Sequence, residues 1–310
     1  MGFLDFIKRL LSPGREDPFA EADVRRRRQR RPRETGLGLM DLSRRLGRPA
    51  SDLQLTPVGY EEFAIPKRAG GKRRILAPQP KLKQLQRRVL RRLLARLRVH
   101  PAAKGFERGE SIVTNARSHV GAAVVVRMDI QDFFGATATH RVREYFTAIG
   151  WGSEAVYLLL KWTTADGGLP QGASTSPRLS NLVNYEMDAR LSALAGRIGG
   201  VYTRYADDIT FSFPSDARLS VGIAIRATKR IVDEYGYRLH LKRKLSIRRR
   251  HQSQRVTGLV VNDRVALPRE TRRRLRAIEH HLRAGREASL TREQLAGWHA
   301  LMAMIEKQRQ

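Results

Sequence analysis

Cysteine is absent from this chain of 310 residues. That absence excludes disulfide bonds, thiol nucleophiles and thiolate metal sites, so any metal ion has to be held by oxygen or imidazole ligands. Long apolar runs are missing too, because stretches such as residues 122–126 fall far short of the roughly 20 residues that a membrane-spanning helix requires. Charged side chains within residues 3–11 argue against a secretory signal. We therefore expect no membrane association and a cytoplasmic location.

Acidic residues are scarce: 30 Asp and Glu side chains face 60 Lys and Arg side chains, which gives a formal net charge of +30. Hydrophobic residues make up 41% of the chain, enough for a folded core, so a disordered polycation is excluded. A charge this large strains a compact fold unless a polyanion neutralises it, and nucleic acid is the expected partner. Only 11 of the 60 basic residues are Lys, and Arg is the residue that binds phosphate in a bidentate way. Charge alone does not separate an enzyme from a noncatalytic binder.

The chain begins with a basic, Arg-rich extension, residues 1–36. An RNA-contacting arm that orders on binding and a merely solvated charged segment are equally compatible with it. Apolar periodicity then predicts a helix over 37–48 and an amphipathic helix with a cationic outer face over 82–97. Between them, two strands around Gly70-Gly71 predict a hairpin with a basic tip over 60–77.

The rest of the chain alternates strands and helices, as in an α/β protein. An almost continuous apolar run over 124–130 predicts a strand buried on both faces, with Asp129 at its end. Alternating apolar residues over 200–213 predict two strands that turn at Ala206-Asp207-Asp208. The remaining predicted elements are a Gly- and Pro-rich loop over 166–177, a basic strand-like segment up to residue 247, and helices over 140–149, 153–162, 181–194, 221–234, 269–284 and 291–307.

Three acids, Asp129, Asp207 and Asp208, are the strongest candidates for chemistry, because carboxylates at strand ends are costly in so basic a chain. Adjacent carboxylates repel each other unless a hard cation lies between them, and Mg²⁺ selects such all-oxygen ligand sets. Two ions about 4 Å apart would activate a 3′-hydroxyl and stabilise a pyrophosphate leaving group, as nucleotidyl transfer requires. The alternative is an ordinary turn pair and an ordinary strand end, since Asp is common in turns.

The residues that flank these acids favour the first interpretation. Two strings around them, RMDIQDFF at 127–134 and YADDITFS at 205–212, resemble the first and third catalytic motifs of reverse transcriptases. LPQGASTSP at 169–177 resembles the motif between them, and IPKRAGGKRRI at 65–75 resembles the fingers hairpin. The resemblance spans about residues 55–262.

Two further strings narrow the resemblance to bacterial retron reverse transcriptases. NARSH at 115–119 fits an Asn-Ala-x-x-His motif, and VTGLVVN at 256–262 fits a Val-Thr-Gly motif. Group II intron enzymes are similar in the palm but carry maturase and often endonuclease regions that residues 263–310 are too few to hold. Both strings together, in this order, are typical of retron enzymes.

The resemblance implies an α/β (α+β) fold of the right-hand polymerase type, with fingers, palm and a small helical thumb. The implied subdomains are fingers over 37–122, palm over 123–262 with a fingers-like insertion around 140–175, and a thumb over 263–310.

The resemblance also implies a role for individual residues. Two Mg²⁺ ions would be held by Asp129, the backbone carbonyl of Ile130, Asp207 and Asp208. The dNTP would be bound by Lys67, Arg73, Phe134, Gln171 and Lys244. Phe134 aligns with the aromatic that excludes a ribose hydroxyl. The alternative is an ordinary core phenylalanine beside Phe133. For the position assigned to Lys244, a second alignment that places Arg243 there is also open.

RNA contacts are implied for both retron motifs, at Asn115, His119, Val256, Thr257 and Gly258. For His119 a buried structural role is an equal alternative.

The expected function is that of a retron RNA-directed DNA polymerase. It would use a cognate non-coding RNA as template and primer, start from an RNA 2′-hydroxyl, and convert dNTPs into an RNA–DNA hybrid and RNA-linked single-stranded DNA. The resemblance further implies an antiphage role with a separate effector protein. The alternatives are a group II intron-like or abortive-infection reverse transcriptase and a noncatalytic RNA-binding protein with a polymerase-like fold.

Overall fold

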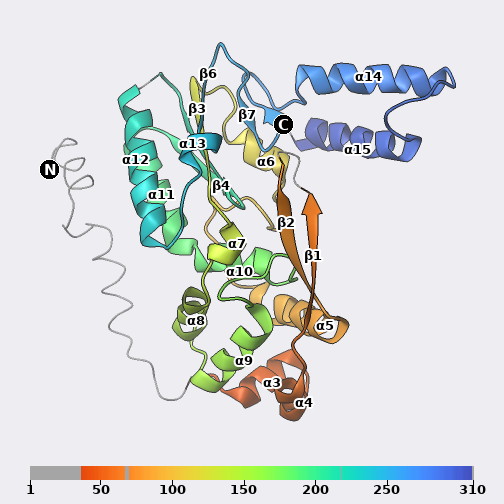
Figure 1. Ribbon diagram of the computed structural model, residues 1–310. Helices are drawn as coiled ribbons and strands as arrows, with labels where there is room; N and C mark the ends of the chain where they lie inside the picture. Colours follow the sequence, from red (N-terminus) through yellow and green to blue (C-terminus); the bar gives the residue numbers. More distant parts are fainter. Residues whose placement is uncertain (1–35, 67–69, 217, 309–310) are drawn as a thin grey trace. The chain divides into compact units, whose positions relative to one another are not determined.

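The computed structural model describes residues 36–66, 70–216 and 218–308 (Figure 1). The predicted basic extension over residues 1–36 therefore lies almost entirely outside the described residues. Contacts divide the chain into two compact units, and each is described by itself. Unit 1 comprises the described parts of Met1–His100 with Gln131–Arg190 and Ile225–Arg238; unit 2 comprises Pro101–Ile130, Leu191–Ala224 and Leu239–Gln310. None of the described helices is long and apolar enough to cross a bilayer.

Unit 2 is built on a four-stranded antiparallel sheet with the order β4-β5-β3-β6. Its strands are β3 (Val124–Asp129), β4 (Val201–Tyr205), β5 (Asp208–Phe213) and β6 (Ser246–Arg249). β3 is an inner strand and four of its six residues are buried, because its valines and Met128 pack on both faces of the sheet. This confirms the strand that the apolar run predicts.

A second core in unit 2 joins short elements to two long helices. The short elements are α6 (Ile112–Arg117), β7 (Arg255–Val256) and β8 (Leu259–Val260); the long helices are α14 (Arg269–Arg283) and α15 (Arg292–Gln308). A further short helix, α13 (Leu241–Lys244), lies against β3. Val113, Val256, Leu275 and Ile305 belong to one buried cluster, so α6, β7, α14 and α15 share a core. α14 and α15 pack against each other (Figure 1).

Unit 1 contains a long hairpin of β1 (Tyr60–Pro66) and β2 (Lys72–Pro78), which pair in register from Tyr60 with Pro78 to Pro66 with Lys72. Gly70 and Gly71 both have positive φ, which side chains with a Cβ rarely adopt. Most of the two strands is exposed, and within Tyr60–Pro66 and Lys72–Pro78 only Pro78 is buried. The predicted hairpin is therefore confirmed in its described part.

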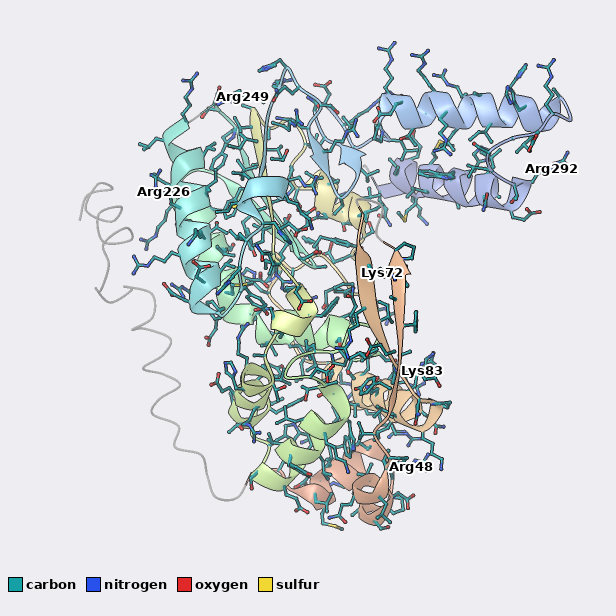
Figure 2. All side chains as sticks on the ribbon, in the orientation of Figure 1. Arg48, Lys72, Lys83, Arg226, Arg249 and Arg292 are labelled. Atoms are coloured by element: carbon teal, nitrogen blue, oxygen red, sulfur yellow. The ribbon has the colours of Figure 1, made fainter. Side chains whose placement is uncertain are left out.

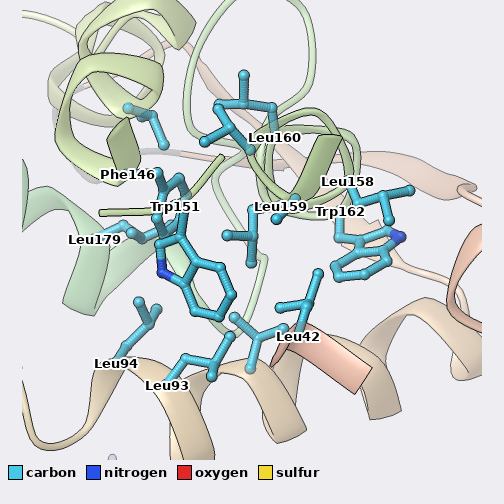
Figure 3. Packing of buried hydrophobic residues seen from close by; sticks show 14 of the residues in the cluster. Leu42, Leu93, Leu94, Phe146, Trp151, Leu158, Leu159, Leu160, Trp162 and Leu179 are labelled. Atoms are coloured by element: carbon cyan, nitrogen blue, oxygen red, sulfur yellow. The ribbon is translucent and has the colours of Figure 1, made fainter. Parts of the chain in front are cut away.

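The helices of unit 1 enclose a leucine-rich core that includes Leu42, Trp151, Leu159 and Trp162 (Figure 3). They are α3 (Leu39–Leu46), α4 (Ala50–Leu55), α5 (Pro80–Val89), η1 (Leu90–Leu94), α7 (Phe133–Ala136), α8 (Thr139–Ala148), α9 (Ser153–Thr163) and α10 (Ser176–Val183). The helix predicted over 82–97 starts at Pro80 and ends in the π-helix η1, in which the Ala95 N–H donates to the Leu90 carbonyl.

Two helices contribute residues to both units, α11 (Tyr185–Arg197) and α12 (Arg218–Glu234). The single helix predicted over 181–194 is wrong: α10 and α11 are separate, and the chain breaks at Asn184 with ψ of 12°. The side chain of Asn184 is buried and hydrogen bonded to three neighbours, so tertiary contacts hold it out of helical geometry.

Candidate active site

The three candidate acids lie at one end of the sheet of unit 2. Asp129 ends β3, Asp208 begins β5, and the two residues face each other in the antiparallel register. Asp207 occupies the turn between β4 and β5, where Tyr205 pairs with Asp208. The structure therefore brings Asp129, Asp207 and Asp208 together from two segments almost 80 residues apart in sequence.

The turn that carries Asp207 is held by several backbone contacts. Ala206 has φ of +57°, a left-handed conformation that costs an alanine about 1 kcal/mol. The Ile130 N–H donates to the Asp207 carbonyl at 2.9 Å, and the buried Arg204 guanidinium donates to the Ala206 carbonyl at 3.0 Å. Gly105 packs so closely that an added Cβ would lie 2.9 Å from the Ala206 nitrogen. These contacts fix the strained turn and with it the position of Asp207.

The electrostatics of the site oppose three ionised carboxylates. Burial raises the pKa of Asp207 above its ordinary value, and the negative charge of Asp129 raises it further. Burial also raises the pKa of Asp208, against the opposing effect of Arg127, whose Nη2 lies 2.5 Å from Asp208 Oδ2. The site therefore carries an excess of negative charge that a bound cation would relieve.

A lysine already lies at this site. Lys244, the last residue of α13, places its Nζ 2.7 Å from Asp129 Oδ1. The His240 N–H donates to the Asp129 carbonyl at 2.8 Å, which holds the start of α13 against the end of β3. Of the two registers that the sequence left open, this geometry favours Lys244 as the residue beside the carboxylates.

A divalent metal fits the chemistry of these residues. The available ligands are carboxylate and backbone oxygens, which Mg²⁺ prefers, and the pKa of Asp207 is raised by burial first and by the Asp129 charge second. Within the described ranges no three acidic or histidine side chains converge into a ready metal cage. Instead, Lys244 and Arg127 engage Asp129 and Asp208, so metal binding would require the Lys244 ammonium to move away from Asp129.

The nucleotide-binding residues expected in the palm loop and hairpin lie in unit 1. The Leu76 N–H of β2 donates to the Gln171 carbonyl at 2.8 Å, which joins the hairpin to the loop. Gly172 has φ of +125°, and an added Cβ would lie 2.7 Å from the Leu76 carbonyl oxygen. Arg73 is exposed on β2, whereas Arg74 is paired with Glu62 and Asp166. Lys67 lies outside the described residues.

A buried glutamine, Gln86, contacts this loop and was not anticipated from the sequence. Gln86 on α5 is 0% exposed, and its amide nitrogen donates to the Trp162 carbonyl and the Tyr60 hydroxyl. Its amide oxygen accepts from the Ser174 N–H at 3.1 Å. One side chain thus connects the base of the hairpin, α9 and the Gln171 loop; a lone Gln on an Arg-rich helix gives no such signal in sequence.

Phe133 and Phe134 occupy different environments on α7. Phe133 is buried and stacks on Tyr237, with ring centroids 5.7 Å apart, whereas Phe134 is only partly buried. The Leu169 N–H donates to the Phe134 carbonyl at 3.1 Å. Phe133 therefore takes the core position that the sequence left open, and Phe134 is the more accessible of the two rings.

The first retron motif points inward. His119 is 1% exposed, and its ring nitrogens lie 2.7 Å from Ser212 Oγ on β5 and 2.7 Å from Thr203 Oγ1 on β4. Burial lowers the pKa of His119 to about 3, so the ring is neutral near pH 7. Asn115 is also 1% exposed. Of the two roles left open for His119, this environment favours the structural one. RNA contact at Asn115 and His119 stays a prediction, and because both side chains are buried they would influence RNA binding only through neighbouring residues.

The second retron motif forms the turn of the β7–β8 hairpin. Thr257 and Gly258 have φ of +47° and +84°, the two positive values of a type I′ turn between the paired residues Val256 and Leu259. Val256 is fully buried, and the Thr257 hydroxyl donates to the Ile112 carbonyl at 2.8 Å. Ile112 begins α6, which carries the first motif, so the two motifs are physically connected. RNA contact by this turn stays a prediction, and Gly258 is its exposed member.

Comparisons with known proteins show the family to which the chain belongs. The family model "Reverse transcriptase (RNA-dependent DNA polymerase)" matches residues 65–261. Among curated proteins, the Retron Mx162 reverse transcriptase of Myxococcus xanthus is 37% identical over 94% of this chain and 69% of its own length. The Retron Mx65 reverse transcriptase of the same organism is 40% identical over 79% and 61%, and the Retron Ec86 reverse transcriptase of Escherichia coli is 32% identical over 80% and 77%.

The fold and the site thus define an RNA-directed DNA polymerase of the α/β class, which confirms the fold and the enzyme class expected from the sequence. The chain belongs to the reverse transcriptase family and, within it, to the retron reverse transcriptases. The subdomain boundaries expected from the sequence stay a prediction, since the two contact-based units follow a different division.

Proposed function

We propose that Asp129, Asp207 and Asp208 form the catalytic centre of this reverse transcriptase. The observation that carries the proposal is their shared position at one end of the sheet, with the pKa of Asp207 raised by burial and by the Asp129 charge. A protein that only binds a polyanion gains nothing from three carboxylates that face it. A polymerase gains a place to hold cations against phosphate.

Mg²⁺ would be held by these three carboxylates and by the carbonyl oxygen of Ile130. Bound there as two ions, it would lower the pKa of the primer 3′-hydroxyl and neutralise charge on the reacting phosphate. The chain's own part is to keep the ligands in place: the Ile130 to Asp207 backbone bond and the Arg204 guanidinium hold the turn. Lys244, released from Asp129, would then be free to donate a proton to the leaving pyrophosphate.

The incoming dNTP would be recognised by residues of unit 1. Arg73, together with Lys67, would bind the triphosphate through charge-assisted hydrogen bonds. Phe134 would exclude a ribose 2′-hydroxyl by steric contact, and Gln171 would approach the sugar from the Gly-rich loop. Support comes from the partial exposure of Phe134 and from the bond between the Gln171 carbonyl and the Leu76 N–H.

The partner would be a structured, cognate non-coding RNA that serves as template and primer. No Asp or Glu occurs between Glu62 and Glu107. The segment from α5 to the residues just after η1 exposes seven cations, Lys81, Lys83, Arg87, Arg91, Arg92, Arg96 and Arg98. Figure 2 shows Lys83 and Arg48 pointing outward from unit 1. Like charges at i and i+4 destabilise a helix, so this composition favours a polyanionic ligand.

The finer retron properties rest on membership of the retron family. We include among them priming from an RNA 2′-hydroxyl, an RNA-linked single-stranded DNA product, a cytoplasmic location and an antiphage role exercised with a separate effector protein. Each is a property of the whole system rather than of the catalytic carboxylates.

The proposal is tested by expressing the chain from its native locus, purifying it and digesting the bound nucleic acid with RNase or DNase. The Asp207→Asn/Asp208→Asn variant is purified in parallel. We expect a discrete RNA-linked single-stranded DNA with the wild type and RNA alone with the variant.

Two other results would lead elsewhere. DNA made on a primed template in vitro, without RNA-linked DNA from the native locus, would favour another bacterial reverse transcriptase lineage. Equal RNA on both proteins, with no extension of a primed RNA by the wild type in Mg²⁺ and dNTPs, would contradict the polymerase assignment.

A further inference from the structure

A buried chain of hydrogen bonds in unit 1 ends on the backbone of the residue before Phe134. Thr137 is 0% exposed, and its hydroxyl donates to the Phe133 carbonyl at 2.8 Å. The same hydroxyl oxygen lies 2.7 Å from the Tyr237 hydroxyl. Because the single proton of Thr137 is used on Phe133, the Tyr237 hydroxyl must be the donor between these two groups.

The direction of the chain continues beyond Tyr237. The Tyr237 hydroxyl accepts from Asn184 Nδ2 at 2.9 Å, and the second proton of that amide goes to the Ser180 carbonyl at 2.8 Å. Asn184 Oδ1 accepts from Arg141 Nη2 at 2.9 Å. The order of donors is therefore Arg141, Asn184, Tyr237, Thr137 and finally the Phe133 carbonyl, with a charged group at its start.

Aromatic stacking reinforces this chain. The Arg141 guanidinium lies 5.0 Å from the ring centroids of both Tyr235 and Tyr237. The Tyr237 ring stacks on Phe133, and Phe133 contacts Phe134 with ring centroids 5.5 Å apart. Tyr237 thus holds Phe133 twice, through its ring and through Thr137.

These contacts and those of the Gln171 loop together fix the backbone of α7. α7 is only four residues long, too short to be rigid on its own, and its N-cap residue, Asp132, has φ of +43°. The Phe134 carbonyl is held by the Leu169 N–H, and Gly168 packs so closely that an added Cβ would lie 2.0 Å from the Gly135 carbonyl oxygen. The ring of Phe134 is therefore positioned by bonds that its own side chain does not make.

We infer that Tyr237 is a positioning residue for sugar selection: its hydroxyl, through Thr137 and the Phe133 carbonyl, sets the place of the Phe134 ring. This inference rests on the proposed role of Phe134 as the sugar gate. Tyr237 itself is 1% exposed, so it would act through its neighbours rather than by contact with a nucleotide. Displacing a positioned group by even 1 Å changes rates by up to about a hundredfold, so loss of one hydroxyl is enough to alter selectivity.

The experiment measures kcat/KM for dNTP and for the matching rNTP in primer extension, and compares Tyr237→Phe with the wild type. Phenylalanine keeps the ring stack and removes only the hydroxyl. We expect the dNTP preference to fall roughly tenfold, mainly through better use of rNTP, while dNTP incorporation changes by less than about twofold.

Tyr235→Phe is the matched control. Tyr235 lies under the same guanidinium, but its hydroxyl is hydrogen bonded to Arg190 and takes no part in the chain to Phe133. A comparable hydroxyl is thus removed, and the dNTP preference should stay unchanged. If Tyr235→Phe lowered the dNTP preference as much as Tyr237→Phe does, the effect would come from a general loosening of the packing, and the inference would be overturned.

Two variants of Thr137, the partner of the Tyr237 hydroxyl, keep the inference testable if Tyr237→Phe fails to fold. Thr137→Val should relax selectivity as Tyr237→Phe does, with no further loss in the double variant, whereas Thr137→Ser should restore it. The role of the bond would be contradicted if the losses of dNTP preference added up in the double variant, or if Thr137→Ser lost as much dNTP preference as Thr137→Val.

Phe134→Ala separates failure of the inference from failure of the gate. We expect it to lower the dNTP preference on the order of a hundredfold. If it does so and Tyr237→Phe does not, the gate stands and the positioning role is wrong. If Phe134→Ala changes nothing, the gate assignment is wrong and the inference falls with it.

Discussion

Two parts of the sheet in unit 2 treat buried polar groups in opposite ways. Asp208 begins β5, and Ser212 lies near the end of the same strand. At the first position carboxylates lie close together, and burial with the Asp129 charge raises the pKa of Asp207 and Asp208; at the second, Ser212, Thr203 and His119 form a neutral set of hydrogen bonds of 2.7 Å. Both regions carry residues of motifs that the sequence marks out.

The difference teaches how a chemical site is told from a scaffold. The histidine network satisfies both ring nitrogens, and burial lowers the pKa of His119 to about 3, so nothing in it is left for a ligand. The carboxylates retain mutual repulsion and need a cation to complete them. Unrelieved electrostatic cost is typical of functional sites, and complete pairing is typical of structural ones.

The largest effect should come from the carboxylate end. Replacing Asp129 by Asn removes a ligand charge while keeping its shape, and primer extension should fall by about a thousandfold or more, since metal ligands supply several kcal/mol of transition-state stabilisation. Single-turnover extension measures the loss, and thermal melting confirms the fold. A variant with a tenth of wild-type activity would remove Asp129 from the chemistry.

His119→Ala should instead cost stability. The change leaves the hydroxyls of Ser212 and Thr203 without their partner and opens a cavity, so the free energy of unfolding should fall by about 3 kcal/mol. Urea denaturation gives this value, and RNA affinity measured well below the melting temperature should match that of the wild type. A loss of RNA affinity without a loss of stability would assign His119 to RNA binding instead.

Lys244→Met tests the cation beside Asp129. Loss of a proton donor in the transition state should reduce the rate of extension by roughly tenfold to a hundredfold. Lys229→Met is the control, because Lys229 pairs with Asp233 on the exposed surface of α12. If both variants extend at the same rate, Lys244 has no part in the reaction.

Acid should weaken the histidine region in a defined pH window. The lowered pKa of His119 means that the unfolded chain binds a proton between about pH 6.5 and about pH 3 that the folded chain does not. The stability that this group contributes is therefore complete above pH 6.5 and decreases on acidification, by at most about 1.4 kcal/mol per pH unit. The raised pKa of Asp207 acts in the opposite direction. Urea titrations of the wild type and His119→Asn should differ in slope only in this window; parallel slopes would contradict the burial of a neutral ring.

The smallest effect is expected at the turn that joins the two retron motifs. Thr257→Val keeps the branched shape and removes the hydrogen bond to Ile112, so unfolding should become easier by about 1 kcal/mol. Thr257→Ser should retain most of that stability. Equal stability of the Val and Ser variants would show that the bond contributes nothing.

Much of the fold was predictable, because local patterns carried it. Gly70-Gly71 marked the hairpin, the apolar run marked β3, and alternating residues with an Asp pair at the turn marked β4 and β5. The candidate carboxylates were predictable for the same reason, since Asp129 ends a clearly patterned strand, Asp208 begins another and Asp207 lies in the turn before it. These features depend on neighbours in sequence.

The rest depended on contacts between distant residues. Asn184 breaks a helix because Arg141 and Tyr237 hold its side chain, and neither Gly nor Pro marks the place. His119 and Thr257 read as RNA contacts in a motif, but their partners, Ser212 and Ile112, lie 93 and 145 residues away. Gln86 is likewise defined by Trp162 and Ser174. The spacing of apolar residues along the sequence does not predict such contacts.

The central claim is that the carboxylates perform chemistry rather than support RNA binding. The most direct test places wild type and Asp207→Asn/Asp208→Asn side by side on one primed RNA template, with Mg²⁺ and dNTPs, and measures extension and RNA affinity on the same preparations. The account predicts extension by the wild type alone, with RNA affinity equal or higher in the variant because two negative charges are gone. Extension by both proteins, or an affinity that is lost together with extension, would contradict it.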